Sequence, residues 1–541
     1  MLFNGRIWPG RDSETALAIE GSRVLGRGPD SEMLALAGPG TRRIDTRGGL
    51  ILPGFNDAHV HFRSGARNLA NLELSSETTV EGVLNRIREF GRSHPEREWL
   101  TGRGWFYAVF PGGMPDRELL DRALPDRPAA IEAYDVHCTW VNSIGLERLG
   151  ISGKTPDPPR GEIVRDREGR PTGIFKEAAM ELVERQLPQP TRAQDLDSLG
   201  RAMAMALSQG ITGVQEAGTA IEEFELYDAL AETGRARLRV RLGQQMEPGL
   251  SITEWDKRLA AWEPLAFGRR HHPWVAGGIV KGFADGVVES ETAMMLAPYE
   301  ARRAGSPGAL GRPQWEPGEL AEAVRVADAR GWQIQVHAIG DGAVRLALDA
   351  YQAAVRENGP RERRHRIEHI ETIDPADIPR FAALGVIASM QPYHADPEPA
   401  QLDLFTSKIG ARASRGWAWG SISRARGRLA FGSDWPVVPF DPRLGLNSAV
   451  HRTTIDGRPV GGWLPDQRLP AAEAIDAYTA DAAYAGWQDD RIGRLEPGML
   501  ADLVVLNQDI LEHPQRIMAT QVLVTIVDGQ VAYARNSETS D

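Results

Sequence analysis

The feature that most restricts the fold of this chain is a regular alternation of strand-like and helix-like segments between about residue 174 and residue 433. The strand-like segments are short and apolar, and the segments between them carry apolar residues at helical spacing. Strands joined by helices lie parallel, because the helix returns the chain to the end of the sheet where the previous strand began. The predicted strands are residues 210–218, 237–245, 276–285, 332–337, 365–370, 386–391 and 428–433, and the predicted helices are residues 174–187, 192–208, 221–232, 320–330, 342–356 and 375–384. With about eight such units, we predict an α/β fold, a closed (β/α)8 TIM-like barrel.

The two ends of the chain read instead as short strands separated by turns. Residues 3–7 are one example, and residues 521–531 are apolar and β-branched around an Asp-Gly hairpin signal. Neither end is long enough to bury a β core of its own. We therefore predict one small β-sandwich domain built from both termini, in which residues 1–55 and 487–541 come together beside a barrel of residues 56–486.

Residues 63–175 form an insertion between the early strands of the predicted barrel. Its first part looks mostly helical and irregular, with strands at residues 99–105 and 127–137, and residues 156–173 indicate a long surface loop or hairpin. Glu177 falls in the helix predicted just after the insertion, where a solvated carboxylate is the simplest interpretation. Because loops at a barrel mouth commonly carry function, we expect the insertion to contribute to substrate selection.

The composition argues against several classes of protein. A net charge of −12 over 541 residues is unlike a nucleic-acid-binding protein, which would present a basic face. The lone Cys138 excludes a disulfide within the chain. Residues 1–8 lack the pattern of a signal peptide, and no stretch reaches the ~18 apolar residues that cross a bilayer. We expect a soluble, cytoplasmic protein with a small-molecule substrate; a homodimer is compatible with the sequence.

Residues 52–61, Leu-Pro-Gly-Phe-Asn-Asp-Ala-His-Val-His, carry the first candidate chemistry. If residues 58–62 form a strand, His59 and His61 point to the same face, because strand side chains alternate. Two imidazoles on one face can reach the same divalent metal, each at about 2.0–2.1 Å. The pair alone is equally well explained as two polar residues on a half-exposed strand, so the other ligands must come from elsewhere.

Four further ionisable residues stand at the carboxyl ends of predicted strands, which is the end where barrel enzymes build their active sites. They are Lys281, His337, His369 and Asp434. Each has a structural explanation by itself: a hydrogen-bonded histidine, a solvated lysine or an aspartate that caps a turn. Together with the histidine pair they make six such residues, and a metal centre explains all of them at once.

The order His-x-His, Lys, His, His, Asp resembles the amidohydrolase superfamily of metal-dependent hydrolases. Residues 52–61, 336–341, 366–369 and 432–436 resemble the branch called amidohydrolase family 3, which contains N-substituted formamide deformylases and relatives of D-aminoacylases. Residues 493–504 are similar to the segment that enters the small β domain in this superfamily. The resemblance spans nearly the whole chain and implies a (β/α)8 barrel with a composite β domain.

Carried over residue by residue, the resemblance implies that His59 and His61 bind the more buried metal and that Asp434 contacts the same ion. It implies that His337 and His369 bind a second metal. Asp434 would accept a proton from the attacking water and later deliver it to the leaving nitrogen.

Lys281 would bridge the two metals after carboxylation by carbon dioxide. A carbamate offers two anionic oxygens, whereas an ammonium group is repelled by a dication. Because family members differ at the bridge and in metal number, an uncarboxylated Lys281 beside a single metal is the other arrangement. Zinc is the default metal for histidine and carboxylate ligands, and iron, manganese and cobalt are compatible.

His137, at another strand end, is the candidate for polarising the substrate carbonyl. Further residues could line the substrate pocket or simply pack: Trp105, Phe106, Tyr107, Tyr393, His394 and Trp435. Glu216 and Asp285 also stand near strand ends and are weaker candidates.

The leading functional hypothesis is a metal-dependent hydrolase that cleaves a C–N bond in an amide, N-acyl or N-formyl group of a small molecule. The alternatives are a mononuclear deaminase or cyclic amide hydrolase of the same superfamily, and a non-catalytic binding barrel. The segment after His337 lacks the glutamate that superfamily base deaminases place there, which disfavours deamination. A non-catalytic barrel would gain nothing from burying six costly polar groups.

Overall fold

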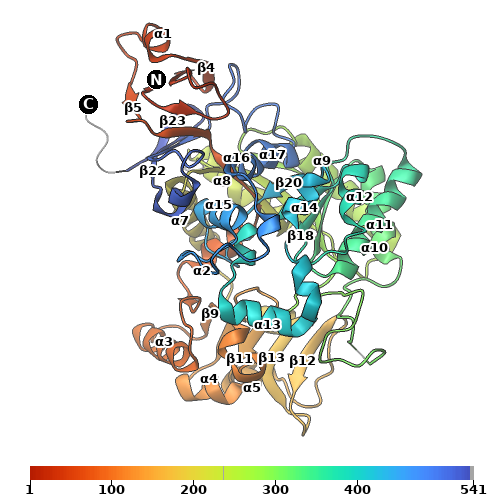
Figure 1. Cartoon of the computed structure of the whole chain (residues 1–541). Helices are drawn as coiled ribbons and strands as arrows, with labels where there is room; N and C mark the ends of the chain where they lie inside the picture. The colour runs from red at the N-terminus through yellow and green to blue at the C-terminus, as the bar shows by residue number, and fades with distance from the viewer. Residues whose placement is uncertain (235–236, 307, 536–541) are drawn as a thin grey trace.

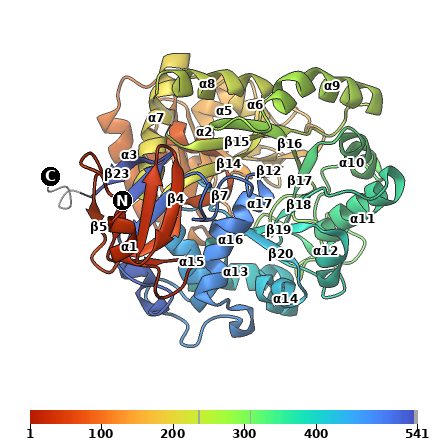
Figure 2. The same ribbon diagram turned by 90° about the horizontal axis from the view of Figure 1, so that it is seen from above.

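The computed structural model describes residues 1–234, 237–306 and 308–535. At its centre, eight parallel strands form a nearly closed barrel ringed by helices (Figure 2). In spatial order the strands are β7 (Phe55–Val60), β14 (Ile211–Thr219), β15 (Arg239–Gln245), β16 (Val275–Phe283), β17 (Gln333–Ala338), β18 (Arg366–His369), β19 (Ile387–Met390) and β20 (Arg428–Phe431). The first and last strands meet where the backbone N–H of Asp434 donates to the carbonyl of His59 at 2.7 Å. The predicted (β/α)8 barrel is confirmed.

The helices that cover the barrel include those predicted for residues 192–208, 221–232, 320–330, 342–356 and 375–384, each with ends within about three residues of the prediction. In chain order the covering helices are α7 (Arg192–Ser208), α8 (Phe224–Glu232), α9 (Ile252–Gly268), α10 (Glu319–Ala329), α11 (Asp341–Asn358), α12 (Ile378–Leu384), α14 (Trp419–Arg424), α15 (Pro442–His451), α16 (Ala471–Tyr478) and α17 (Ala480–Ala485). Helix α7, for example, begins at a capping box between Thr191 and Gln194 and packs Leu199 and Met203 against the strands. No helix in the described ranges is both long and apolar enough to cross a membrane.

The insertion is a separate α/β layer below the barrel in Figure 1, at the carboxyl ends of the barrel strands. Its mixed sheet has the order β12 (Gly161–Arg165), β13 (Pro171–Glu177), β11 (Cys138–Val141), β10 (Ala129–Ala133), β9 (Leu100–Trp105) and β8 (Leu72–Glu73). Helices α3 (Val80–Ser93), α4 (Arg117–Ala123) and α5 (Ser143–Leu149) accompany it, and α13 (Pro399–Ile409) reaches toward it from the barrel side. The first part of the insertion is mostly helical and irregular as expected, and the strands predicted at residues 99–105 and 127–137 are present as β9 and β10, the latter shorter. Residues 161–177 form the expected hairpin. The pairing of these strands into one six-stranded sheet was not predicted.

The helix predicted for residues 174–187 is also wrong, because β13 runs to Glu177 and only α6 (Glu181–Glu184) is α-helical in this stretch. Pairing with the neighbouring strand explains the difference: Trp140 lies opposite Ile174, and Cys138 lies opposite Lys176. Ile174 packs into one core and Phe175 into another, as expected for residues on opposite faces of a sheet.

The strands of the two terminal segments pair into one small domain, at the upper left of Figure 1. One sheet has the order β2 (Arg6–Ile7), β6 (Leu50–Pro53), β21 (Leu503–Leu506), β22 (Val522–Val527) and β23 (Gln530–Ala534), and the other has the order β4 (Arg23–Gly28), β3 (Ala16–Glu20), β1 (Leu2–Phe3) and β5 (Ile44–Asp45). Strand β6 joins the N-terminal to the C-terminal part, since Leu52 lies opposite Val504. Residues 536–541 of the predicted C-terminal part lie outside the described residues.

Candidate metal centre and active site

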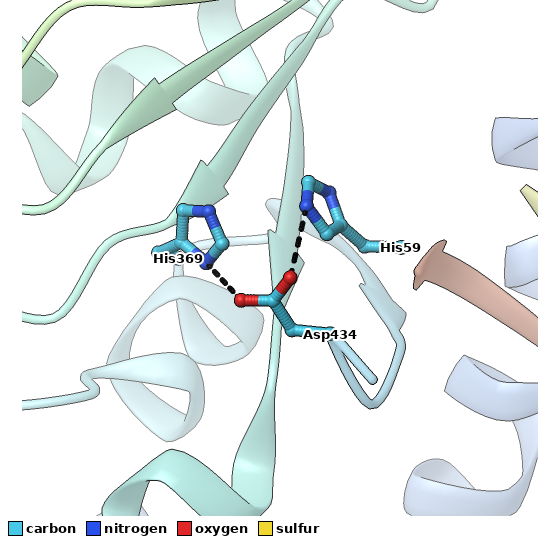
Figure 3. Close-up of side chains that lie close together, drawn as sticks. All are labelled: His59, His369 and Asp434. Atoms are coloured by element: carbon cyan, nitrogen blue, oxygen red, sulfur yellow. Dashed lines mark ion pairs between the residues drawn. The ribbon is translucent and has the colours of Figure 1, made fainter. Parts of the chain in front are cut away.

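Asp434 is the hub of a buried cluster at the carboxyl ends of the barrel strands (Figure 3). Its Oδ1 lies 3.4 Å from Nε2 of His59, and its Oδ2 lies 3.7 Å from Nδ1 of His369. One ligand atom from each of these three side chains lies within 4.8 Å of the others. Nε2 of His61 also lies 3.4 Å from Asp434 Oδ1. The structure thus brings three of the predicted ligands, His59, His61 and His369, to a fourth, the carboxylate of Asp434.

The two histidines of the His-x-His segment reach this point differently from the prediction. Strand β7 ends at Val60, and His61 precedes helix α2 (Phe62–Asn68) with its backbone N–H donating to the carbonyl of Trp435 at 2.8 Å. This bond takes His61 out of the strand ladder. The strand expected over residues 58–62 therefore spans residues 55–60 instead, yet both imidazoles still approach Asp434.

Glu368, which the sequence analysis did not single out, orients His59. Its Oε2 lies 2.6 Å from Nδ1 of His59, and Nε of Arg366 donates to its Oε1 at 2.9 Å. A carboxylate that accepts the Nδ1 proton fixes the imidazole with Nε2 free to bind a metal. The signal was present in the sequence, because Glu368 and Arg366 both lie in the motif that ends at His369.

His369 and Asp434 both adopt left-handed backbone conformations, with φ of 76° and 63°. Such values are uncommon for residues other than glycine and cost conformational energy. Here the chain turns sharply as it leaves β18 and β20, and the turn aims both side chains toward the same point. Nδ1 of His369 is also 2.8 Å from Oε1 of Gln391.

The two remaining predicted ligands lie beside this group. The ring of His337 is 4.5 Å from that of His369 between centroids, and its Nε2 lies 3.1 Å from the carbonyl of Gly286. Lys281 is fully buried, and its Nζ lies 4.2 Å from the centre of the Phe283 ring without a hydrogen-bond partner in the described part of the chain. An amine buried without a polar partner is costly, so this position calls for another group.

The electrostatics of the cluster suit a cation. Burial lowers the pKa of His59, His337 and His369 well below the usual range of histidine. Burial, followed by the charge of Lys281, lowers the pKa of His61 to about 3. These imidazoles are therefore neutral at neutral pH, which is the form that binds metals.

Two further groups in the cluster have shifted pKa values. Burial raises the pKa of Asp434 to about 7 and lowers the pKa of Lys281 to about 8. Within the described ranges, Nε2 of His59 and Oδ1 of Asp434 are buried without hydrogen-bond partners. A divalent metal would satisfy both atoms, so the donor set fits the metal that the sequence implies.

A cavity of about 670 Å³ adjoins this cluster and is lined by residues of both the barrel and the insertion. Five of the residues predicted for the substrate pocket line it: Phe106, His137, Tyr393, His394 and Trp435. Tyr107 does not line it, because its side chain is buried in the core of the insertion. Trp105 does not line it either, and this prediction is corrected. Its indole is fully buried in the core of the insertion and donates to the carbonyl of Ile131 at 2.9 Å, whereas the next residue, Phe106, faces the cavity.

His137 enters the cavity from the insertion, paired with a buried carboxylate. Its Nδ1 lies 2.9 Å from Oε2 of Glu177, at the end of β13, and its ring is 5.3 Å from that of His337. Burial opposes the charge of His137, but the carboxylates of Glu177 and Asp135 outweigh it and raise the pKa to about 9. Burial likewise opposes the charge of Glu177, and His137 outweighs it and lowers that pKa. The interpretation of Glu177 as a solvated helix residue was wrong, because its side chain is buried at the end of β13. There it contacts His137 and favours the charged imidazole.

The two weaker candidates have mainly structural contacts. Asp285 accepts backbone N–H groups from Met294, Ile339 and Gly340 at 2.8–3.0 Å. Glu216 accepts the backbone N–H of Arg63 at 2.8 Å and the hydroxyl of Tyr227, and it lines a second cavity of about 380 Å³ on another side of His61.

Comparison with known proteins agrees with this architecture. Residues 42–533 match the sequence profile of the amidohydrolase family. The chain belongs to the amidohydrolase family. Membership supports a metal-dependent hydrolase, and the cluster around Asp434 supplies the donors that such an enzyme needs.

Two curated relatives and one solved structure cover almost the whole chain. The protein LONG AFTER FAR-RED 3 of Arabidopsis thaliana is 29% identical over 98% of this chain and 91% of its own length. The N-substituted formamide deformylase of Arthrobacter pascens is 27% identical over 96% of this chain and 95% of its own length. An uncharacterized metal-dependent hydrolase from Pyrococcus furiosus superposes with a TM-score of 0.70 at 26% identity, covering 94% of this chain and 99% of the other.

Proposed function

We propose that this amidohydrolase-family protein is a metal-dependent hydrolase that cleaves the C–N bond of an amide, N-acyl or N-formyl group in a small molecule. The observation that carries the proposal is the approach of three imidazoles to the single carboxylate of Asp434 at the floor of a cavity. The similarity to an N-substituted formamide deformylase favours the C–N bond over other hydrolysable bonds. A cytoplasmic location and a homodimer stay predictions from the sequence.

The residues divide into two sets of metal ligands. His59, His61 and Asp434 would hold the deeper metal, and His337 and His369 would hold the second. Zinc is the metal that histidine and carboxylate donors most commonly bind.

Lys281 would complete the centre as a carbamate. Its lowered pKa leaves part of the amine uncharged near neutral pH, and an uncharged amine can add to carbon dioxide and release one proton. The carbamate would be a buried anion beside the metal ions, whereas the free amine is buried without a partner.

A bound divalent metal supplies a water of lowered pKa and a Lewis acid for the substrate carbonyl. The chain's own residues then handle the proton and the developing charge. Asp434 can take up a proton and return it to the leaving nitrogen. His137, held charged by Glu177, can donate a hydrogen bond to the carbonyl oxygen as negative charge accumulates on it.

The test combines metal analysis with a substrate panel. Protein purified without chelator or nickel resin is analysed by plasma mass spectrometry and then assayed with N-benzylformamide, N-benzylacetamide and N-acetyl amino acids by detecting the released amine. One or two metal equivalents together with hydrolysis that disappears in Asp434→Asn would support the proposal, and Asp403→Asn, an exposed carboxylate on α13, is the matched control. A protein that holds no metal and takes up none when zinc is added would contradict it.

A further inference from the structure

Three carboxylates line the main cavity outside the metal centre. None of them has a step of its own in the hydrolytic mechanism, although Asp135 helps to keep His137 charged. Asp135 comes from the turn between β10 and β11 of the insertion, Glu289 from the loop after β16, and Glu371 from the loop after β18. They come from segments far apart in the sequence, so the cluster is assembled by the tertiary fold.

Asp135 is the most constrained of the three, with only 6% of its surface exposed. Its Oδ1 accepts the backbone N–H of His137 and the hydroxyl of Tyr107, both at 3.1 Å. Its Oδ2 is buried and has no hydrogen-bond partner among the described residues. A buried carboxylate oxygen without a donor at a cavity wall calls for a ligand that supplies one.

No lysine or arginine forms an ion pair with these carboxylates in the described part of the chain, since none lies within 4.0 Å of Asp135, Glu289 or Glu371. The charge of the nearby His137 does not cancel the effect of burial, because the pKa of Asp135 is still raised. Burial and then the charge of Glu371 raise the pKa of Glu289 to about 8. A cation placed among the three would remove the repulsion and stabilise all of them as carboxylates.

The spacing and surroundings indicate an organic cation. Among the described residues, only His59, His369 and Asp434 offer three ligand atoms within 4.8 Å of one another, so the three carboxylates stand too far apart to enclose one small ion. Phe106 and Tyr134 stack at 4.6 Å beside them and line the same cavity. Aromatic faces next to carboxylates attract ammonium, amidinium and guanidinium groups.

The three carboxylates lie close to the metal centre, where the scissile bond would be held. Nδ1 of His394 is 3.5 Å from Oε1 of Glu371, and Nε2 of the same ring is 3.7 Å from Oδ2 of Asp434. One imidazole therefore separates the acidic cluster from the metal centre.

We propose that Asp135, Glu289 and Glu371 bind a cationic group of the substrate, so that the enzyme selects N-acyl or amide compounds that carry a positive charge beyond the scissile bond. This inference rests on the proposed function for the reaction, but the binding of the cation can be measured without hydrolysis.

The experiment compares two aromatic probes of nearly the same shape, benzamidine, which is cationic, and benzamide, which is neutral. Isothermal titration calorimetry on the purified full-length protein at pH 7.5 measures both affinities. We expect benzamidine to bind roughly ten-fold more tightly, equivalent to about 1.4 kcal/mol, because its charged amidinium donates hydrogen bonds to carboxylates in a desolvated site. The preference should disappear in Glu289→Gln and in Asp135→Asn and remain in Asp403→Asn.

Two variants are used because Asp135 also holds the turn that carries His137, so its replacement could disturb folding, whereas Glu289 has no such contact in the described ranges. Equal affinity for the two probes, or a preference that survives both substitutions, would overturn the inference. Displacement of benzamidine by calcium or magnesium, with one extra metal equivalent that depends on Glu289, would also overturn it by showing an inorganic cation site. None of these outcomes depends on whether N-acyl compounds are hydrolysed.

Discussion

Glu368 Oε2 lies 2.6 Å from Nδ1 of His59, and both side chains are fully buried although 309 residues separate them in the sequence. This contact joins β18 to β7 and fixes which nitrogen of His59 faces Asp434. Removing the carboxylate leaves the imidazole free to rotate and to change tautomer.

We therefore predict that Glu368→Gln lowers zinc affinity about 10–100-fold, the usual effect of losing an outer partner of a metal ligand. Competition with a zinc-binding dye measures the change. Glu222→Gln, at an exposed position, should leave the affinity unchanged. An unchanged affinity in Glu368→Gln would show that His59 is not a ligand.

Metal affinity should rise with pH between about 6 and 8. The pKa of Asp434 is raised to about 7 in the protein, so the carboxyl is protonated below that value and must lose its proton before it can bind a cation. The histidines contribute little to this dependence, because burial already keeps them neutral. Titrations with zinc should show Asp434 releasing nearly one proton at pH 6 and almost none at pH 8, and an affinity that is flat over this range would contradict the assignment.

The pairing of Glu177 with His137 predicts the alkaline limit of activity. With its pKa raised to about 9, His137 is charged below pH 9, and activity should fall as the pH rises through that value. In Glu177→Gln, burial remains while the favourable carboxylate is gone, so the pKa falls and the loss of activity begins at a lower pH. At pH 8 a histidine with the ordinary pKa of ~6.5 is about 3% charged, which gives a roughly thirty-fold lower kcat.

The pH profile of kcat for both proteins measures this shift. Glu168→Gln, in the exposed turn of the same hairpin, is the control. A profile whose alkaline limb does not move would mean that His137 does not act in the charged form.

The contrast between Glu177 and His369 shows which parts of the site the sequence could predict. The histidines and Asp434 stand at the ends of strands whose apolar runs are visible locally, and the barrel then brings those ends together. Glu177 follows Phe-Lys and precedes two alanines, a composition that favours a helix. It ends β13, and this strand pairs with β11, about 40 residues away, so the strand depends on a partner that local propensity does not contain. Glu177 itself lies opposite Gly161 of β12 and has a left-handed φ of 51°.

Glu368 escaped prediction for a similar reason, because its role depends on a partner at the other end of the barrel domain. Its position between Arg366 and His369 was visible, but the contact with His59 was not. The sheet of the insertion is an intermediate case: several of its strands were visible in the sequence, but their order in one sheet depends on pairing between segments that are remote in sequence.

Lys281→Ala should remove the bridge between the two sets of ligands. We expect metal content to fall from two equivalents to one and hydrolysis to drop at least about a hundred-fold. In the unsubstituted protein, carbon-13 NMR after incubation with labelled bicarbonate should show a carbamate signal that is absent in Lys281→Ala and present in Lys257→Ala, an exposed lysine on α9. Two metal equivalents in Lys281→Ala, or no carbamate signal in the unsubstituted protein, would favour the arrangement with an uncarboxylated lysine.

Trp105 and Phe106 are neighbours in sequence, but the structure gives them opposite roles, which two alanine substitutions can separate. Trp105 fills the core of the insertion, so Trp105→Ala should cost about 3–5 kcal/mol of stability through the cavity it leaves. Phe106 is half-buried and faces the substrate cavity, so Phe106→Ala should cost little stability and raise KM roughly ten-fold. Urea denaturation and Michaelis kinetics on both variants measure the two effects. If Trp105→Ala raised KM without loss of stability, Trp105 would contact the substrate as the sequence first suggested, and the placement of the β9 side chains would be wrong.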